Sequence, residues 1–75
     1  MQQYKNFSGQ SHVIAYENGD GYIKVKFASG YWTLYTYTNT SAGLENIQQM
    51  QQLAVAGQGF NSFISHYKPF YENKC

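Results

Sequence analysis

The amino-acid sequence predicts a small α+β domain, in which a three-stranded antiparallel meander is followed by two short helices packed on one face of the sheet. Three observations favour this fold class. Apolar and polar residues alternate along residues 22–27, and turn-forming Asn, Asp, Ser and Gly residues flank that run. After residue 40 the apolar spacing changes from two residues to three and four. With 75 residues, the chain has room for one domain.

Three runs of residues suited to a pleated surface come first. They cover residues 11–17, 22–27 and 31–38, and the turns at 18–21 and 28–30 separate them. Because the runs are short, consecutive and joined by tight turns, an antiparallel meander is the simplest arrangement.

The first predicted helix follows these strands. Thr40 or Ser41 is expected to cap it by accepting a hydrogen bond from an unpaired backbone N–H, and Glu45 lies in the first turn, where the helix dipole favours an anion. Gly57 is expected to end it. Its apolar stripe is formed by Leu44, Ile47, Met50 and Ala54.

A second helical stripe begins after Gly59. Pro69 disfavours helical geometry at the residue before it, so this helix is expected to stop at Tyr67 or Lys68. Its apolar face is formed by Phe60, Phe63, Ile64 and Tyr67.

The rest of the chain is predicted to lie outside a single domain at 11–68. Residues 1–10 are polar and are expected to form a flexible N-terminal arm, and residues 69–75 a C-terminal tail. The single cysteine, Cys75, is the last residue, so no internal disulfide can form, and a reducing, cytoplasmic location is favoured. We expect neither a secretory signal nor a membrane span. Dimerisation would add stability to so small a core, so a homodimer is compatible with the sequence.

Composition excludes two classes of protein. A net charge of +1, with five Lys and no Arg, excludes a strongly basic nucleic-acid clamp, which needs clustered Lys and Arg. An aromatic content of 19% is too high for a disordered chain.

Residues that carry catalysis or bind metals are sparse. His12, His66 and Cys75 lie far apart in the sequence and lack the spacing of zinc sites. Neither a nucleophile elbow nor a phosphate-binding loop is present. We therefore expect a protein that is not an enzyme and that carries no cofactor or metal.

Tyrosines in the third run give the most informative functional signal. The helices are expected to cover the sheet face that holds Ile23, Val25, Phe27, Trp32 and Leu34. The open face is then expected to carry Tyr22, Lys24, Lys26, Tyr31, Tyr35 and Tyr37.

Three interpretations of this tyrosine-rich face are open. Nucleobases stack on aromatic rings for about 1–3 kcal/mol each while lysines follow the phosphates. A protein partner is equally suited, because tyrosines dominate interface hot spots. The rings could also pack only on the N-terminal arm, on the tail or on each other.

The chain also resembles the KTSC domain family. The resemblance rests on Ile23-x-Val25-x-Phe27-x-x-Gly30, then Tyr35-Thr36-Tyr37, then Ala54-x-x-Gly57-x-x-Phe60-Asn61-x-x-Ile64-x-x-Tyr67. It covers about residues 11–68. Thr38-Asn39-Thr40-Ser41 replaces the Val-Pro usual after the tyrosine pair, and the segment between Gly30 and Tyr35 is longer than expected.

This resemblance implies a small bacterial or phage domain of a kind also found at the C-terminus of some lysyl-tRNA synthetases. It implies no established enzymatic activity, and RNA binding has been suggested for the family. The signature positions it implies are Gly30, Tyr35, Tyr37, Gly57, Phe60, Asn61 and Ile64.

Together these patterns predict a small non-catalytic binding module. The leading hypothesis is binding of RNA or single-stranded nucleic acid through the tyrosine-rich face. The alternative is a protein–protein interaction module, such as a small phage or mobile-element protein that binds and blocks a host protein.

Overall fold

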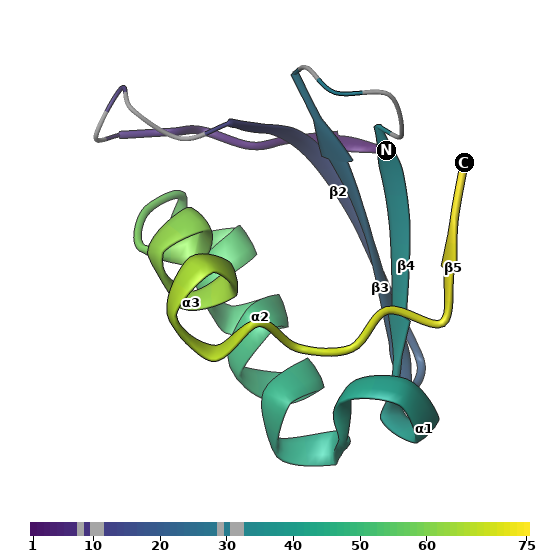
Figure 1. Cartoon of the computed structure of the whole chain (residues 1–75). Coiled ribbons are helices and arrows are strands. Elements are labelled where there is room, and N and C mark those ends of the chain that lie inside the picture. Colours follow the sequence, from purple (N-terminus) through teal and green to yellow (C-terminus); the bar gives the residue numbers. More distant parts are fainter. Residues whose placement is uncertain (8, 10–11, 29, 31–32) are drawn as a thin grey trace.

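The computed structural model describes residues 1–7, 9, 12–28, 30 and 33–75. These residues form one antiparallel sheet, with strand order β1-β2-β3-β4-β5, and three helices (Figure 1). The α+β class is confirmed, but five strands are present where three were predicted, because each end of the chain adds one. The elements are β1 (Gln2–Gln3), β2 (Val13–Gly19), β3 (Tyr22–Phe27), β4 (Leu34–Thr38), α1 (Asn39–Ala42), α2 (Leu44–Ala56), α3 (Phe60–Tyr67) and β5 (Asn73–Lys74).

The central strands form the predicted meander because tight turns join them. Asp20 and Gly21 connect β2 to β3, and the register pairs Gly19 with Tyr22. Gly21 has φ +81°, a region that favours glycine, so the sequence supplies the residue that this turn needs. Strand β3 has the predicted bounds, whereas β2 starts two residues later than expected and continues to Gly19.

Helix α1 begins with a capping box. The backbone N–H of Ser41 donates to Oγ1 of Thr38 at 3.1 Å, and the backbone N–H of Thr38 donates to Oγ of Ser41 at 3.0 Å. Thr38 therefore caps this short helix, which was not predicted. The predicted helix is α2, and its N-cap is Gly43, with no side-chain cap, not the expected Thr40 or Ser41. Gly43, with φ +94°, then separates this short helix from α2.

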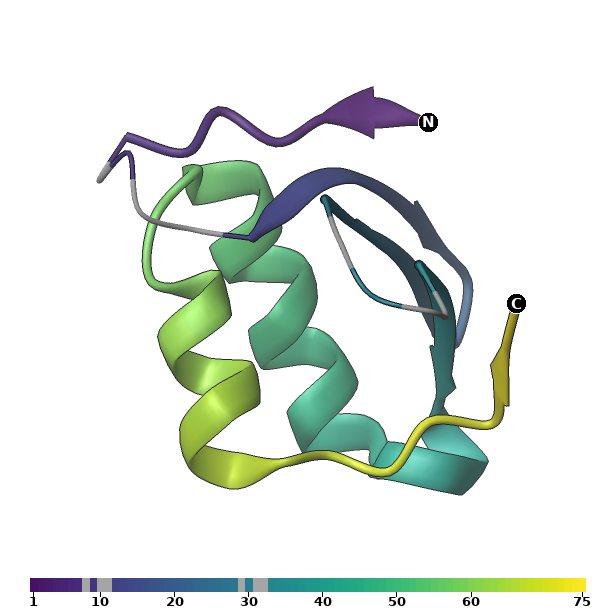
Figure 2. The ribbon, with the colours of Figure 1, turned by 45° about the horizontal axis from the view of Figure 1, so that its top comes forward.

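Helices α2 and α3 lie side by side on one face of the sheet (Figure 2). As predicted, α2 buries Ile47, Met50 and Ala54, and Gly57 ends it in the left-handed conformation. Leu44, which was predicted in the same stripe, is 55% exposed because it lies in the first turn.

Helix α3 ends at Tyr67, with Lys68 as its C-cap directly before Pro69, which agrees with the prediction. Of its predicted apolar face, Phe60 is buried, whereas Tyr67 is 62% exposed. None of the helices in the described residues is long and apolar enough to cross a bilayer.

The core lies between this helix pair and the sheet. Helix α2 packs against β3 and β4, and α3 packs against α2. The buried side chains are Tyr4, Val13, Ile23, Val25, Tyr37, Ile47, Met50, Ala54 and Phe60.

The start of the chain belongs to this core, which differs from the flexible arm expected at 1–10. Strand β1 pairs with β2, and the Tyr4 ring is 3% exposed, with its centroid 5.8 Å from that of Phe60. The backbone N–H of Phe7 donates to the Gly57 carbonyl at 2.8 Å. A Cβ on Gly57 would lie 2.7 Å from the nearest atom of this segment. This glycine therefore both ends α2 and lets the N-terminal segment approach closely.

The C-terminal segment 69–75 completes the sheet. It crosses from α3 to the edge of β4 (Figure 1), where the backbone N–H of Glu72 donates to the Thr36 carbonyl at 2.7 Å. The backbone N–H of Cys75 donates to the Leu34 carbonyl at 2.8 Å. What the sequence predicted only as a tail is an edge strand, β5, and the segment that leads to it.

Candidate functional site

Tyr35 and Tyr37 lie on the helix-covered face of the sheet. Residues directly opposite each other in an antiparallel pair share a face. Tyr37 is opposite Ile23, and Tyr35 is opposite Val25. Both partners are fully buried under the helices. The expectation that these two tyrosines stand on the open face is therefore wrong.

The error lies in which side of β4 points inward. Its sequence LYTYT alternates tyrosine with residues of intermediate character, so neither side is clearly the apolar one. We expected Leu34 to point inward, but it pairs with Lys26 on the outer face. Successive side chains of a strand point to opposite faces, so placing Leu34 on the inner face assigned every β4 side chain to the wrong face. Tyr31 and Trp32, which entered the same prediction, lie outside the described residues.

Tyr22, Lys24 and Lys26 do lie on the outer face, because they alternate with the buried residues of β3. The Tyr22 hydroxyl donates to Oε2 of Glu17 at 3.0 Å, and this hydrogen bond raises the pKa of Tyr22. A Cβ on Gly19 would overlap the Tyr22 ring, so the ring lies against the β2 backbone. Among the described residues of β2, β3 and β4, Tyr22 is the one aromatic ring on this face.

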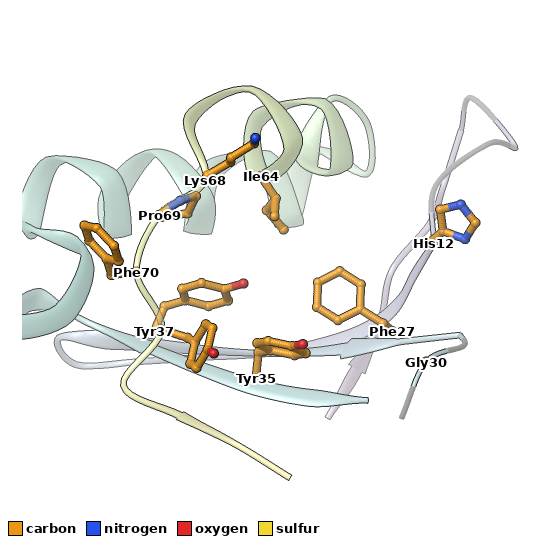
Figure 3. A pocket seen from close by; sticks show the side chains of 10 residues that line it. His12, Phe27, Gly30, Tyr35, Tyr37, Ile64, Lys68, Pro69 and Phe70 are labelled. Atoms are coloured by element: carbon orange, nitrogen blue, oxygen red, sulfur yellow. The ribbon is translucent and has the colours of Figure 1, made fainter. Parts of the chain in front are cut away.

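A cleft of about 640 Å³ opens on the other face, between the sheet, α3 and the C-terminal segment (Figure 3). The sheet supplies its aromatic floor, α3 lies above that floor, and the segment after α3 closes one side. We call it the aromatic cleft. Its lining residues are His12, Phe27, Gly30, Tyr35, Tyr37, Ile64, Lys68, Pro69, Phe70 and Tyr71.

Ring contacts fix the floor of the aromatic cleft. Tyr35 contacts Phe27 edge to face at a centroid distance of 5.3 Å and Tyr71 at 5.0 Å, and it stacks on Tyr37 at 6.4 Å. Offset-stacked and edge-to-face pairs each add about 0.5–1.5 kcal/mol beyond burial of area. Tyr35 therefore sits at the centre of a ring cluster that joins β3, β4 and the C-terminal segment.

Tyr37 is the most buried of the described residues that line the cleft. Tyr37 is 3% exposed, and among the described residues its hydroxyl has no hydrogen-bond partner. Figure 3 shows its side chain pointing into the space between Ile64 and Phe27. Burial, followed by the neighbouring Tyr35 and Tyr71, raises the pKa of Tyr37 to about 12. At neutral pH the group is therefore a neutral hydroxyl that can donate a hydrogen bond.

The charged side chains at the aromatic cleft are cationic. Lys68 lines it and has φ +48°, a left-handed conformation that costs a residue with a Cβ roughly 1–2 kcal/mol. Nearby, Nζ of Lys74 lies 5.1 Å from the Tyr71 ring centroid, and a hydrogen bond to Tyr71 raises the pKa of Lys74. No acidic side chain is among the described lining residues. The cleft therefore favours a neutral or anionic occupant.

Sequence reasoning missed one wall of the cleft. Pro69, Phe70 and Tyr71 were predicted only as a C-terminal tail on which the tyrosines could pack, and all three line the cleft. The contacts of Tyr35 with Tyr71 and Tyr37 agree with the interpretation that the rings pack on the tail and on each other. The sequence signal for this wall was a pair of aromatic residues directly after the proline that ends α3. The proline redirects the chain, and large aromatic rings are stabilised by packing on an apolar surface.

The cleft offers ring surfaces, hydroxyl groups, the imidazole of His12 and the ammonium group of Lys68. In the part of the chain that the structure describes, no three His, Cys, Asp or Glu side chains gather as metal ligands would. His66 lies on α3 with its ring 4.9 Å from that of Tyr67, and it does not line the cleft. These are groups that hold a ligand by ring contact and hydrogen bonding.

The signature residues implied by the KTSC resemblance fall into two groups. Gly30 and Ile64 line the aromatic cleft together with Tyr35 and Tyr37. Gly57 ends α2, Phe60 is fully buried, and Asn61 is half-buried in the first turn of α3. In comparisons with known proteins, no family model, curated protein or solved structure matches the chain. Membership of the KTSC family therefore stays a prediction.

Proposed function

We propose that this chain is a non-catalytic module that binds a protein partner by taking one large side chain of that partner into the aromatic cleft. The observation that carries the proposal is the cleft itself, a cavity of about 640 Å³ with rings from two strands and from the C-terminal segment. Pockets of this size and lining are typical ligand sites, and buried aromatic contacts dominate the energy of protein interfaces.

The rim of the cleft supports the same function. Phe70 is 78% exposed and Tyr71 is 42% exposed, although both are large apolar side chains. Covering them would bury apolar surface at about 25 cal/mol per Å². A partner that inserts a side chain would also cover this rim, so the cleft and the exposed rings form one continuous contact surface.

Binding of RNA or single-stranded nucleic acid is the second candidate. Lys24 and Lys26 favour it, because both lie on the outer face, where they could contact phosphates. Two features weigh against it. Glu17 stands opposite Lys24 in the register, and Tyr35 and Tyr37 are not on that face to stack with bases.

Peptides selected from a random displayed library against the full chain test the proposal. We expect the selected peptides to share an aromatic or large aliphatic anchor. Their affinity should fall at least about tenfold in Phe70→Ala, which removes a ring from the rim, and in Ile64→Trp, which fills the cleft.

Two matched controls locate the site. Phe7→Ala removes a ring that is 66% exposed and does not line the cleft, and it should leave peptide affinity unchanged. Lys24→Ala with Lys26→Ala should also leave it unchanged. Peptides that bind Ile64→Trp as well as the unmodified chain would contradict the proposal. Salt-sensitive oligonucleotide binding that the lysine pair abolishes would support the second candidate instead.

A further inference from the structure

The Tyr37 hydroxyl sets a condition on what can occupy the aromatic cleft. Tyr37 is 3% exposed. Among the described residues, every polar side-chain atom that is fully buried has a hydrogen-bond partner. Because this hydroxyl has no partner among them, it must be part of the small area of Tyr37 that remains exposed, and Figure 3 shows the side chain directed into the cleft. The hydroxyl is therefore open to an occupant from the cleft side.

A purely apolar occupant would isolate this hydroxyl. Water can reach the group in the open cleft, but a phenylalanine or leucine side chain would displace that water without replacing its hydrogen bond. Leaving a buried donor unpaired costs about 1–3 kcal/mol, which would offset much of the gain from burying the side chain. The cleft therefore favours an occupant that brings a hydrogen-bond acceptor to its floor.

The walls of the cleft favour a flat aromatic body. Phe27 and Tyr35, which are half-buried, present rings along its floor beside the buried Tyr37, and Tyr71 stands edge-on to Tyr35. A planar ring can enter such a site by stacking or by edge-to-face contact. Among aromatic protein side chains, tryptophan supplies only a donor and phenylalanine supplies neither group. Neutral histidine and tyrosine both carry an acceptor, but tyrosine brings the larger apolar ring, with its oxygen at the far end.

We propose that the aromatic cleft is a tyrosine-recognition site, in which a tyrosine side chain of the partner protein enters and its hydroxyl oxygen accepts a hydrogen bond from the Tyr37 hydroxyl. This rests on the proposed function, because it specifies the anchor of the same cleft. Tyr37 keeps its proton well above neutral pH, so it is available as the donor under ordinary conditions. Lys68, which is the charged lining residue, tolerates this neutral anchor.

A pair of probes that differ by one oxygen tests the proposal. The full chain is titrated with N-acetyl-tyrosine amide and with N-acetyl-phenylalanine amide, and binding is followed by NMR shifts of cleft residues. We expect the tyrosine probe to bind about tenfold more tightly, which corresponds to about one hydrogen bond in a shielded site. In Tyr37→Phe, which removes only the hydroxyl, this preference should disappear or reverse.

The preference ratio separates recognition from a structural role, because a loss of fold in Tyr37→Phe would weaken both probes equally. Equal affinity of the two probes for the unmodified chain would overturn the tyrosine inference and leave the proposed function standing. No shift of cleft residues with either probe up to its solubility, or equal binding to Ile64→Trp, would overturn both. Tighter binding of uridine or adenosine than of the tyrosine probe would overturn the inference in favour of a nucleobase.

Discussion

The two faces of the central sheet carry the same residue type in different surroundings. On the helix-covered face, Tyr35 and Tyr37 stand opposite the buried Val25 and Ile23 and form the floor of a cleft. On the outer face, Tyr22 lies against the β2 backbone and donates its hydroxyl to Glu17.

This difference teaches that a tyrosine's role depends on whether its hydroxyl is satisfied. The outer Tyr22 has a carboxylate partner, so both its ring and its hydroxyl are engaged within the chain. The inner Tyr37 is buried as a ring but has a hydroxyl without a partner among the described residues. Only the inner arrangement leaves a polar group ready to meet a ligand.

Truncation on the two faces of β3 should give the largest contrast. Ile23 is fully buried, so Ile23→Ala should lower the free energy of unfolding by about 2–5 kcal/mol through lost burial and a cavity. Lys24→Ala, one residue away on the outer face, should change it by less than about 0.5 kcal/mol. Urea unfolding followed by circular dichroism measures both.

Ile23→Val provides a second point if Ile23→Ala is largely unfolded, with an expected loss of about 0.5–1.5 kcal/mol. Equal effects of the Ile23 and Lys24 substitutions would show that the inner face is not the core.

At alkaline pH, the buried Tyr37 should lower the free energy of unfolding, and this effect is expected to be smaller than that of Ile23→Ala. Burial raises the pKa of Tyr37 from 10.0 to about 12, so the folded state holds this proton more tightly than the unfolded state. The resulting stability is complete below pH 10 and is lost as pH rises through about 12. At about 1.4 kcal/mol per pKa unit, the rise from 10.0 to about 12 corresponds to a loss on the order of 3 kcal/mol.

The measurement compares the pH dependence of unfolding in the unmodified chain and in Tyr37→Phe. The variant has no phenol to ionise at this position, so its stability should fall less steeply above pH 10. Parallel curves for the two proteins would contradict a buried, protonated Tyr37.

The smallest expected effect is on the outer tyrosine. Its raised pKa comes first from the hydrogen bond to Glu17 and then from the charge of that carboxylate. Glu17→Gln should therefore lower the pKa of Tyr22 toward its ordinary value without a measurable change in the urea midpoint. The ring signals of the tyrosines, followed by NMR during a pH titration, resolve Tyr22 among the eight tyrosines of the chain, and the Tyr37 titration in the same sample is the internal control. An unchanged Tyr22 titration would break the contrast between the two faces.

Local patterns were sufficient to predict the elements in which apolar periodicity, secondary-structure propensity and the terminating residues all indicate the same structure. The alternation of Ile23 and Val25 with lysines predicted β3 and its buried side. The stripe of Ile47 and Met50, ended by Gly57, predicted α2. In each case one side is clearly apolar and a glycine or proline marks the end, so the sequence has one low-energy solution.

The two end strands could not be predicted in the same way. Strands β1 and β5 have two residues each, too few for a period to be visible, and they exist because the edges of β2 and β4 offer unpaired backbone groups. Tyr4 and Tyr71 gave a weak signal, since each is a large ring in a polar segment that packs only when the rest of the fold is present.

The sequence by itself determined the α+β class, the central meander and the two main helices, because hydrophobic periodicity and turn residues act over short distances along the chain. Only the tertiary structure decided which side of β4 faces the helices, and with it the aromatic cleft. Tyrosine is stable on either face of a sheet, so the choice depends on the space that α3 and residues 69–75 leave to be filled. That space is created by segments distant in sequence, and no local pattern encodes it.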